Sequence, residues 1–218
     1  MKRHTQSPII LMLSVLIILA TPLISEAGYV IENELNDSYL LAQNLDPYFT
    51  YGTNQVIEID STGTLSDFSA SVYGLSGDST YDYYSFSVGT GSSPLMTNTL
   101  VVFDIDFAYI NWVDTFLTLF DTDGTTLLAY NDDTSFNGPG DMTSPSLNSF
   151  ISYTFTTAGT YYIRVSEFNE QAPPYGDVLS TDGNYQLHVS SISTIPVPSS
   201  LLLMIPGLLG YIRIRHKF

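Results

Sequence analysis

The sequence has no cysteine, and its 218 residues include only six lysines and arginines, three histidines and one tryptophan. Without cysteine the chain forms neither disulfides nor thiolate metal sites, and it has no thiol nucleophile. Arg164 is the only lysine or arginine between residues 28 and 195, whereas 21 of the 22 acidic residues lie there. That segment therefore has a net charge near −20. Such a surface repels nucleic acid and anionic lipid, so both are poor partners. Binding a cation such as Ca²⁺ would relieve the repulsion among its own acidic groups.

The same shortages restrict enzymatic chemistry. His188 is the only histidine between residues 28 and 195, and it lies on the polar side of an alternating segment, where we expect an exposed side chain. The segment has no lysine and no Gly-x-Ser-x-Gly motif. Carboxylates are numerous enough for a glycoside hydrolase pair, but their abundance alone is weak evidence. We therefore predict a protein that is not an enzyme and rank a carboxylate-pair glycoside hydrolase below a structural or binding role.

The N-terminal segment has the layout of a secretory signal peptide. Lys2 and Arg3 precede an apolar run from residue 9 to 20, and small residues precede Gly28 at positions −1 and −3. These features predict a signal peptide over residues 1–27 that is cleaved between Ala27 and Gly28. The alternative is an uncleaved N-terminal anchor, for which the apolar run is short.

Residues 195–218 combine a Pro/Ser motif, an apolar run from residue 201 to 212 and a basic end. They resemble the PEP-CTERM tail of exported bacterial proteins, although Val197 occupies the position of the family's central glutamate. The resemblance implies an exosortase-like processing enzyme, a transient inner-membrane anchor and delivery to the cell envelope or the extracellular space. The alternative is an ordinary tail anchor followed by basic residues. The residues that fit the sorting motif are Pro196, Pro198, Ser199 and Ser200.

Between the two ends, residues 28–194 show alternating apolar and polar positions separated by Gly, Asp, Ser and Pro, with no long helical period. This pattern predicts a single all-β domain, an antiparallel sandwich of about eight or nine strands. A short helix is expected within residues 36–44, where Asp37 or Ser38 provides a cap. The expected strands cover residues 56–59, 84–88, 100–105, 115–120, 125–130, 151–155, 161–165 and 185–189.

The order of several motifs in this domain resembles the bacterial pre-peptidase C-terminal domain. The motifs are Glu32-Asn33-Glu34-Leu35-Asn36-Asp37, the stretch from Gly77 to Val88 (GDSTYDYYSFSV), the hairpin from Asp114 to Asp133, and Gly159 to Val165 (GTYYIRV). The resemblance spans about residues 29 to 191. It implies a jelly-roll-like β-sandwich of secreted proteins, with an accessory rather than a catalytic role.

Calcium-binding members of that family hold the ion with an E-x-E-x-N-D run and with acids before the Asp-Tyr-Tyr strand. Ca²⁺ prefers six to eight oxygen ligands, and an extended Glu-x-Glu places both carboxylates on one side. The alternative is that the two glutamates are solvated and that Asn36-Asp37 caps a helical turn. The resemblance points to the following first set of calcium ligands: Glu32, Glu34, Asn36, Asp37, Asp78 and Asp82.

The hairpin between residues 114 and 133 is rich in oxygen ligands and provides a second candidate cation site. Its Asp-Thr-Asp-Gly turn is not an EF-hand loop, because the glycine comes fourth and no glutamate follows at the required distance. The alternative is a set of solvated turn acids. The second set consists of Asp114, Asp121, Asp123, Asn131, Asp132 and Asp133.

Aromatic side chains are the remaining signal, because the chain has 16 tyrosines. Tyr109, Trp112 and Tyr130 can form a stacking platform for sugar rings, although alternating tyrosines also serve as cross-strand pairs. We therefore expect a calcium-stabilised domain with a structural, adhesive or accessory role outside the inner membrane. The alternative is a carbohydrate-binding module for surface polysaccharide.

Overall fold

The computed structural model describes residues 28–51, 68–75, 79–91, 93–106, 113–133, 148–172, 176–180 and 184–192. The predicted signal peptide, the expected strand at 56–59 and the predicted sorting tail lie outside these ranges, as do Asp78, Tyr109 and Trp112. Within the described ranges, no helix is long and apolar enough to span a membrane.

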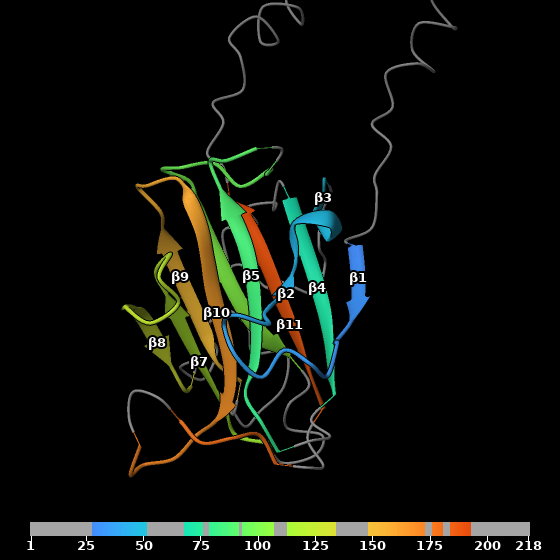
Figure 1. Cartoon of the computed structure of the whole chain (residues 1–218), viewed down its shortest axis with the longest axis vertical. Helices are drawn as coiled ribbons and strands as arrows, with labels where there is room; N and C mark the ends of the chain where they lie inside the picture. The colour runs from blue at the N-terminus through green and yellow to red at the C-terminus, as the bar shows by residue number, and fades with distance from the viewer. Residues whose placement is uncertain are drawn as a thin grey trace, which may run out of the picture.

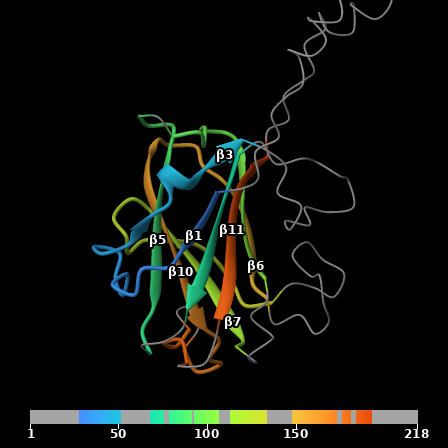
Figure 2. The same cartoon turned by 90° about the vertical axis from the view of Figure 1, so that its right-hand side faces the viewer.

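These ranges form eleven strands and one short 3-10 helix, η1, at Asp46–Tyr48. Figure 1 shows the strands running along the long axis of the domain, and Figure 2 shows them from the side as two layers. The strands are β1 (Gly28–Ile31), β2 (Gln43–Asn44), β3 (Thr50–Tyr51), β4 (Phe68–Leu75), β5 (Asp82–Val88), β6 (Leu100–Asp106), β7 (Thr115–Phe120), β8 (Leu127–Asn131), β9 (Phe150–Thr154), β10 (Gly159–Glu167) and β11 (Asn184–Ile192).

The two layers are two sheets with different strand orders. Sheet A has the order β1-β4-β11-β6-β9, with β3 paired to β4, and sheet B has the order β2-β5-β10-β7-β8. The predicted all-β, jelly-roll-like sandwich is confirmed. Both sheets are mixed rather than wholly antiparallel, because β1 pairs with β4 and β2 pairs with β5 in parallel. These parallel pairs follow from the N-terminal segment, which runs from sheet A to sheet B and back before β4 begins.

An aromatic cluster fills the space between the sheets. Phe86 from β5 lies 5.2 Å from Phe103 and 5.6 Å from Phe155 between ring centroids, and Phe155 lies 4.4 Å from Tyr161. All four rings are buried. Strands of period two place such residues on one face, so their burial accounts for the predicted alternation in β5, β9 and β10.

The expected helix within residues 36–44 is wrong. Turns occupy this stretch, with hydrogen bonds from Asn36 N–H to Asn33 O and from Leu41 N–H to Ser38 O, and β2 begins at Gln43. Asn and Ser side chains favour such turns over a continuous helix. The chain instead makes its helical turn at η1, where Pro47 supplies a fixed backbone angle.

The single arginine of this region lies on the outer face of sheet B. The Arg164 guanidinium lies 4.5 Å from the centre of the Tyr81 ring and 5.5 Å from that of Phe120. Its NH2 group also contacts the Thr118 hydroxyl at 3.3 Å. Arg164 thus covers Thr118 and Phe120, and the Tyr130 and Phe168 rings stack on Phe116, so β7 is buried along its whole length.

Candidate functional site

Three residues of the first predicted calcium set come together in a buried cluster. Glu32, Asn36 and Asp82 are 7%, 1% and 3% exposed, and they meet the hydroxyl groups of Tyr84 and Tyr185. We call these five residues the carboxylate–tyrosine cluster. It lies between the two sheets, because Tyr84 belongs to β5 of sheet B and Tyr185 to β11 of sheet A.

Backbone hydrogen bonds position the two N-terminal members of the cluster. Glu32 follows β1 directly, and its N–H donates to Tyr73 O of β4. Asn36 lies in the next turn, where its carbonyl accepts from Tyr83 N–H of β5 at 2.9 Å. Asp82 and Tyr84 are two residues apart on β5, so both point inward from the same face. The segment after β1 therefore spans from one sheet to the other and carries Glu32 and Asn36 into the interior.

Four neutral groups surround the Glu32 carboxylate. Its Oε1 accepts from Asn36 Nδ2 at 3.0 Å and from the Tyr84 hydroxyl at 2.9 Å, and the Tyr185 hydroxyl lies at 3.5 Å. Its Oε2 accepts from Leu75 N–H at 2.6 Å. Hydrogen bonds compensate much of the cost of burying a carboxylate, but none of these donors brings a positive charge.

The oxygens of the cluster form a row that is short of hydrogens. Glu32 Oε1, the Tyr84 hydroxyl, the Tyr185 hydroxyl and Asp82 Oδ2 follow one another at distances of 2.9, 2.6 and 2.6 Å. Each of these three contacts needs one hydrogen, and the two phenols supply two. With both carboxylates ionised the row therefore lacks one hydrogen. A cation bound among these oxygens removes that need, because it attracts all of them at once.

Burial keeps both tyrosines of the row protonated. Removal from water raises the pKa of Tyr84 and of Tyr185 well above the usual range, and it is the main cause in each case. The negative charge of Glu32 is the next cause for the pKa of Tyr84, and that of Asp82 for the pKa of Tyr185. The phenols therefore act as neutral oxygen groups beside the two carboxylates.

Of the other members of the first set, Asp78 lies outside the described residues, and Glu34 and Asp37 lie apart from this interior. Glu34 and Asp37 are exposed, and Asp37 accepts a hydrogen bond from the Thr80 hydroxyl at 3.3 Å. Within the part of the chain that the structure describes, no three His, Cys, Asp or Glu side chains are grouped to hold a metal ion. The cluster nevertheless offers the hard oxygen ligands that Ca²⁺ prefers, from two carboxylates, one amide and two hydroxyls. The residues that would hold the ion are Glu32, Asn36 and Asp82.

The structure separates the second predicted set into two groups at opposite ends of the β7–β8 hairpin. Asp121 and Asp123 lie at the turn. At the other end, Asp114 precedes β7, Asn131 is the last residue of β8, and Asp132 and Asp133 follow it. Six residues of strand lie between the two ends, which corresponds to about 20 Å. One ion therefore contacts one group or the other.

At the turn end, Asp123 serves the hairpin itself. Its Oδ1 accepts from the backbone N–H groups of Thr125 and Thr126, and its Oδ2 accepts from the Thr126 hydroxyl at 2.6 Å. These bonds, the Thr126 hydroxyl first, lower the pKa of Asp123 to about 2. Asp123 therefore acts as a turn residue of the kind that the Asp-Gly sequence predicts.

At the other end, Asp114 lies among acidic neighbours. Burial, followed by the charges of Asp133, Asp132 and Glu167, raises the pKa of Asp114 to about 6. Oδ1 of Asp114 and Oδ1 of Asn131 are buried and have no hydrogen-bond partner among the described residues. The ionised form of Asp114 is therefore disfavoured in the folded protein.

Replacing Asp114 with asparagine should raise stability at pH 7.5 and not at pH 4. The folded carboxyl binds its proton more tightly than the unfolded one, so the contribution of this group to stability is greatest below pH 4 and falls as the pH rises to about 6. The gain at pH 7.5 should be about 1 kcal/mol, because solvent screens a half-buried group. Urea unfolding in chelator at both pH values measures this gain. An equal effect of Asp114→Asn at pH 4 and pH 7.5 would contradict it.

The expectation of an exposed His188 is wrong, because its side chain is fully buried. Its Nδ1 lies 2.7 Å from the Ser71 hydroxyl, and its Nε2 lies 3.2 Å from Asp106 Oδ2. Sequence reasoning missed this Ser–His–Asp arrangement, since Ser71 lies in no expected strand and Asp106 lies just beyond the expected strand at 100–105. A serine nucleophile must be reached by its substrate, whereas Ser71 is completely buried. We therefore regard the arrangement as a structural polar contact.

The comparisons with known proteins concern the centre of the domain. The model of a family described as the bacterial pre-peptidase C-terminal domain matches residues 80–167, which run from just before β5 to the end of β10. No curated protein matches the chain. The matched range contains Asp82 and Tyr84 and the whole β7–β8 hairpin, whereas Glu32, Asn36 and Tyr185 lie outside it.

Proposed function

The chain contains a bacterial pre-peptidase C-terminal domain, and from this we propose that it is an exported, non-enzymatic protein whose β-sandwich binds Ca²⁺. Its role would be structural, adhesive or accessory at the cell envelope or in the extracellular matrix. The domain is typical of secreted bacterial proteins, which supports export. The proposed route uses the signal peptide over residues 1–27 and an exosortase-like enzyme that processes the tail over residues 195–218.

One observation carries the calcium proposal: the buried row of oxygens from Glu32 to Asp82 with one hydrogen too few. Neutral donors hold the Glu32 carboxylate in the interior, the buried Asp82 carboxylate accepts from the Tyr185 hydroxyl, and the domain around them has a net charge near −20. A divalent cation at this position offsets the charge of both carboxylates and ties β1, β5 and β11 together. In this proposal the ion has a structural role, because it joins the N-terminal segment to both sheets.

Calcium should raise the melting temperature of the purified protein. An ion that binds only the folded state at about 100 times its Kd adds about 2.7 kcal/mol of stability. For a domain of this size that corresponds to a rise of about 5–10 °C, which scanning calorimetry in 1 mM Ca²⁺ and in chelator measures. Mg²⁺ at the same concentration should give a smaller rise, because it demands octahedral geometry and keeps its waters.

The absence of any shift with calcium would contradict the proposal. A shift that survives substitution of Glu32 but is lost in Asp114→Asn would instead place the ion at the far end of the hairpin. The two candidate positions are therefore distinguished by the same measurement.

The alternative of a glycoside hydrolase ranks lower. The buried carboxylates among the described residues are Glu32, Asp82, Asp104 and Asp106, and exposed fractions of 7% or less leave a polysaccharide no access to them. The alternative of a carbohydrate-binding module is favoured by a separate observation, a hollow at one edge of the sandwich.

A further inference from the structure

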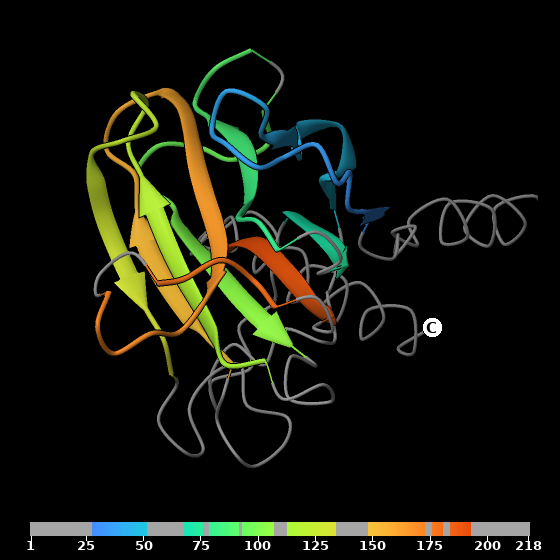
Figure 3. The ribbon, with the colours of Figure 1, turned by 60° about the horizontal axis from the view of Figure 1, so that its bottom comes forward.

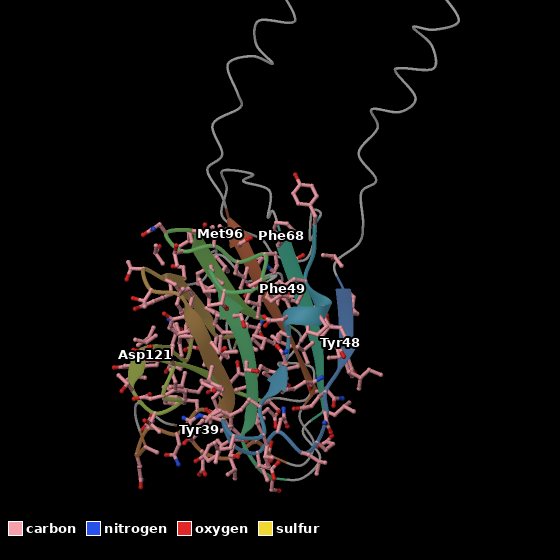
Figure 4. The ribbon with its side chains drawn as sticks, turned by 45° about the horizontal axis from the view of Figure 1, so that its top comes forward. Tyr39, Tyr48, Phe49, Phe68, Met96 and Asp121 are labelled. Atoms are coloured by element: carbon pink, nitrogen blue, oxygen red, sulfur yellow. The ribbon has the colours of Figure 1, made fainter. Side chains whose placement is uncertain are left out.

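A hollow of about 280 Å³ lies where the two sheets meet at one edge. Its walls come from the β7–β8 turn, from β8 of sheet B, from β9 of sheet A and from the β9–β10 turn. Figure 3 shows β8 and β9 close together at this edge, and Figure 4 places Asp121 at the outer edge, away from Tyr48 and Phe49. The volume is close to the lower end of small-molecule sites, about 300 Å³, and suits one ring-sized unit.

Gly159 allows the two turns to form one hollow. A Cβ atom on Gly159 would lie 2.5 Å from Cγ2 of Thr122, which is too close for any real contact. Because Gly159 has no side chain, Thr122 of the β7–β8 turn packs directly against the start of β10. A side chain at position 159 would therefore displace Thr122, so the glycine keeps the two turns in contact.

Aromatic rings form the inner wall of the hollow. Tyr153 and Phe155 contact each other edge to face at 4.8 Å, and Tyr161 lies 4.4 Å from Phe155. Phe155 and Tyr161 are buried, whereas Tyr153 is half-buried and so presents part of its ring to the hollow. The Tyr161 hydroxyl is held in place because it donates to Thr157 O at 2.7 Å.

Polar groups line the mouth. Asp121 Oδ1 accepts from Thr122 N–H at 2.7 Å, whereas Oδ2 has no hydrogen-bond partner among the described residues. The Tyr153 hydroxyl likewise has no partner there, and Thr156 and Thr157 are exposed. The Asp121 charge is also close enough to raise the pKa of Tyr161, after the larger effect of burial. A carboxylate, a phenol and threonine hydroxyls thus converge on an aromatic wall.

We propose that this hollow binds one sugar unit of a neutral polysaccharide. A pyranose ring has apolar C–H faces that pack on aromatic rings and hydroxyls around its edge that donate to a carboxylate and exchange hydrogen bonds with threonine and tyrosine. Asp121 and the net charge of the domain disfavour anionic polymers. This inference rests on the adhesive role in the proposed function, and it names neutral polysaccharide as the class of ligand. It involves none of the carboxylate–tyrosine cluster.

Isothermal titration of the purified full-length protein tests the site with defined probes. The neutral probes are cellohexaose, laminarihexaose, maltohexaose and mannohexaose, and hexagalacturonate is the anionic control. We expect at least one neutral probe to bind with a Kd of about 1 mM or tighter and hexagalacturonate not to bind. Asp121→Asn should weaken binding by about tenfold or more, because the amide carries no charge for the ligand hydroxyls.

Matched variants separate the hollow from the rest of the surface. Tyr153→Ala removes the stacking ring and should abolish detectable binding, and Tyr153→Phe should weaken it less. Tyr51→Ala and Glu170→Gln change an exposed aromatic ring and an exposed acid outside the hollow, and they should leave the Kd unchanged.

Failure to bind every neutral probe at about 10 mM would overturn the inference, as would equal losses in the hollow variants and the matched controls. The calcium-dependent melting temperature is recorded on the same samples. A protein that responds to calcium but binds no neutral probe overturns the glycan site alone, and the reverse result overturns the calcium proposal alone.

Discussion

Replacing Glu32 with alanine should lower the free energy of unfolding by about 3–5 kcal/mol in chelator, since buried donors are left without an acceptor. Leu75 N–H, the Asn36 amide and the Tyr84 hydroxyl all donate to this one carboxylate. Each buried donor that loses its partner costs about 1–3 kcal/mol, and the costs are not additive because the cluster relaxes as a unit. Urea denaturation followed by circular dichroism measures the loss.

The matched control is Glu170→Ala, which removes an exposed glutamate from the loop after β10 and should change stability by less than about 0.5 kcal/mol. A loss below about 1 kcal/mol in Glu32→Ala would show that the buried hydrogen bonds of Glu32 contribute little to the fold.

Replacing Gly74 with alanine should cost about 2–4 kcal/mol, because the added methyl group occupies the position of a tyrosine ring. A Cβ atom on Gly74 would lie 2.2 Å from Cζ of Tyr185 and 2.4–2.5 Å from its two Cε atoms. The ring must move, and its hydroxyl then leaves Tyr84 and Asp82, which it contacts at 2.6 Å each. Gly74 is therefore the residue of β4 that makes room for the cluster.

A double-mutant cycle tests this cause. In a Tyr185→Leu background the ring is gone, so adding Gly74→Ala should cost less than about 1 kcal/mol. Equal costs of Gly74→Ala in the two backgrounds would show that the strand, rather than Tyr185, makes the glycine necessary.

Several of the strands that were predicted from the sequence have a clear apolar alternation, whereas β6 was predicted from a near-continuous apolar run and β7 and β8 from the turn between them. β5, β9, β10 and β11 place large apolar side chains at every second position, and their inward faces are buried. β4 was missed because Ser69, Ser71 and Gly74 interrupt its pattern, although the two serines are buried. The polar face of a strand can be buried when another segment of the chain packs over the sheet. The alternation of the strand itself does not show whether such a segment is present.

The candidate site was predicted in part, and the reason lies in sequence separation. Glu32, Asn36 and Asp82 were identified from short motifs, whereas Tyr185 is 101 residues from Tyr84 and belongs to no motif with it. Only the packing of sheet A on sheet B brings the two hydroxyls together. Similarly, the hollow depends on a contact between Thr122 and Gly159 in two separate turns, which no local pattern indicates.

The separation of the second set follows from strand geometry alone. Residues at the two ends of a six-residue strand lie about 20 Å apart, so Asp114 and Asp123 belong to different ends of the hairpin. The Asp-Gly turn and the return of β8 were correctly predicted from turn chemistry.

The most direct test of the calcium account is the melting experiment run on Glu32→Gln beside the wild type. Glutamine keeps the shape of glutamate, and its oxygen can accept from Leu75 N–H. Its NH2 group can donate the third hydrogen to the row that ends at Asp82, and also to Asn36 once the Asn36 amide turns its oxygen toward it. We predict that in chelator Glu32→Gln melts at or above the wild-type temperature. We predict that 1 mM Ca²⁺ raises the melting temperature of the wild type by about 5–10 °C and leaves that of the variant unchanged. The account would be contradicted if Glu32→Gln melted below the wild type in chelator and its melting temperature rose with calcium as much as that of the wild type. Such a result would exclude a cation site at Glu32.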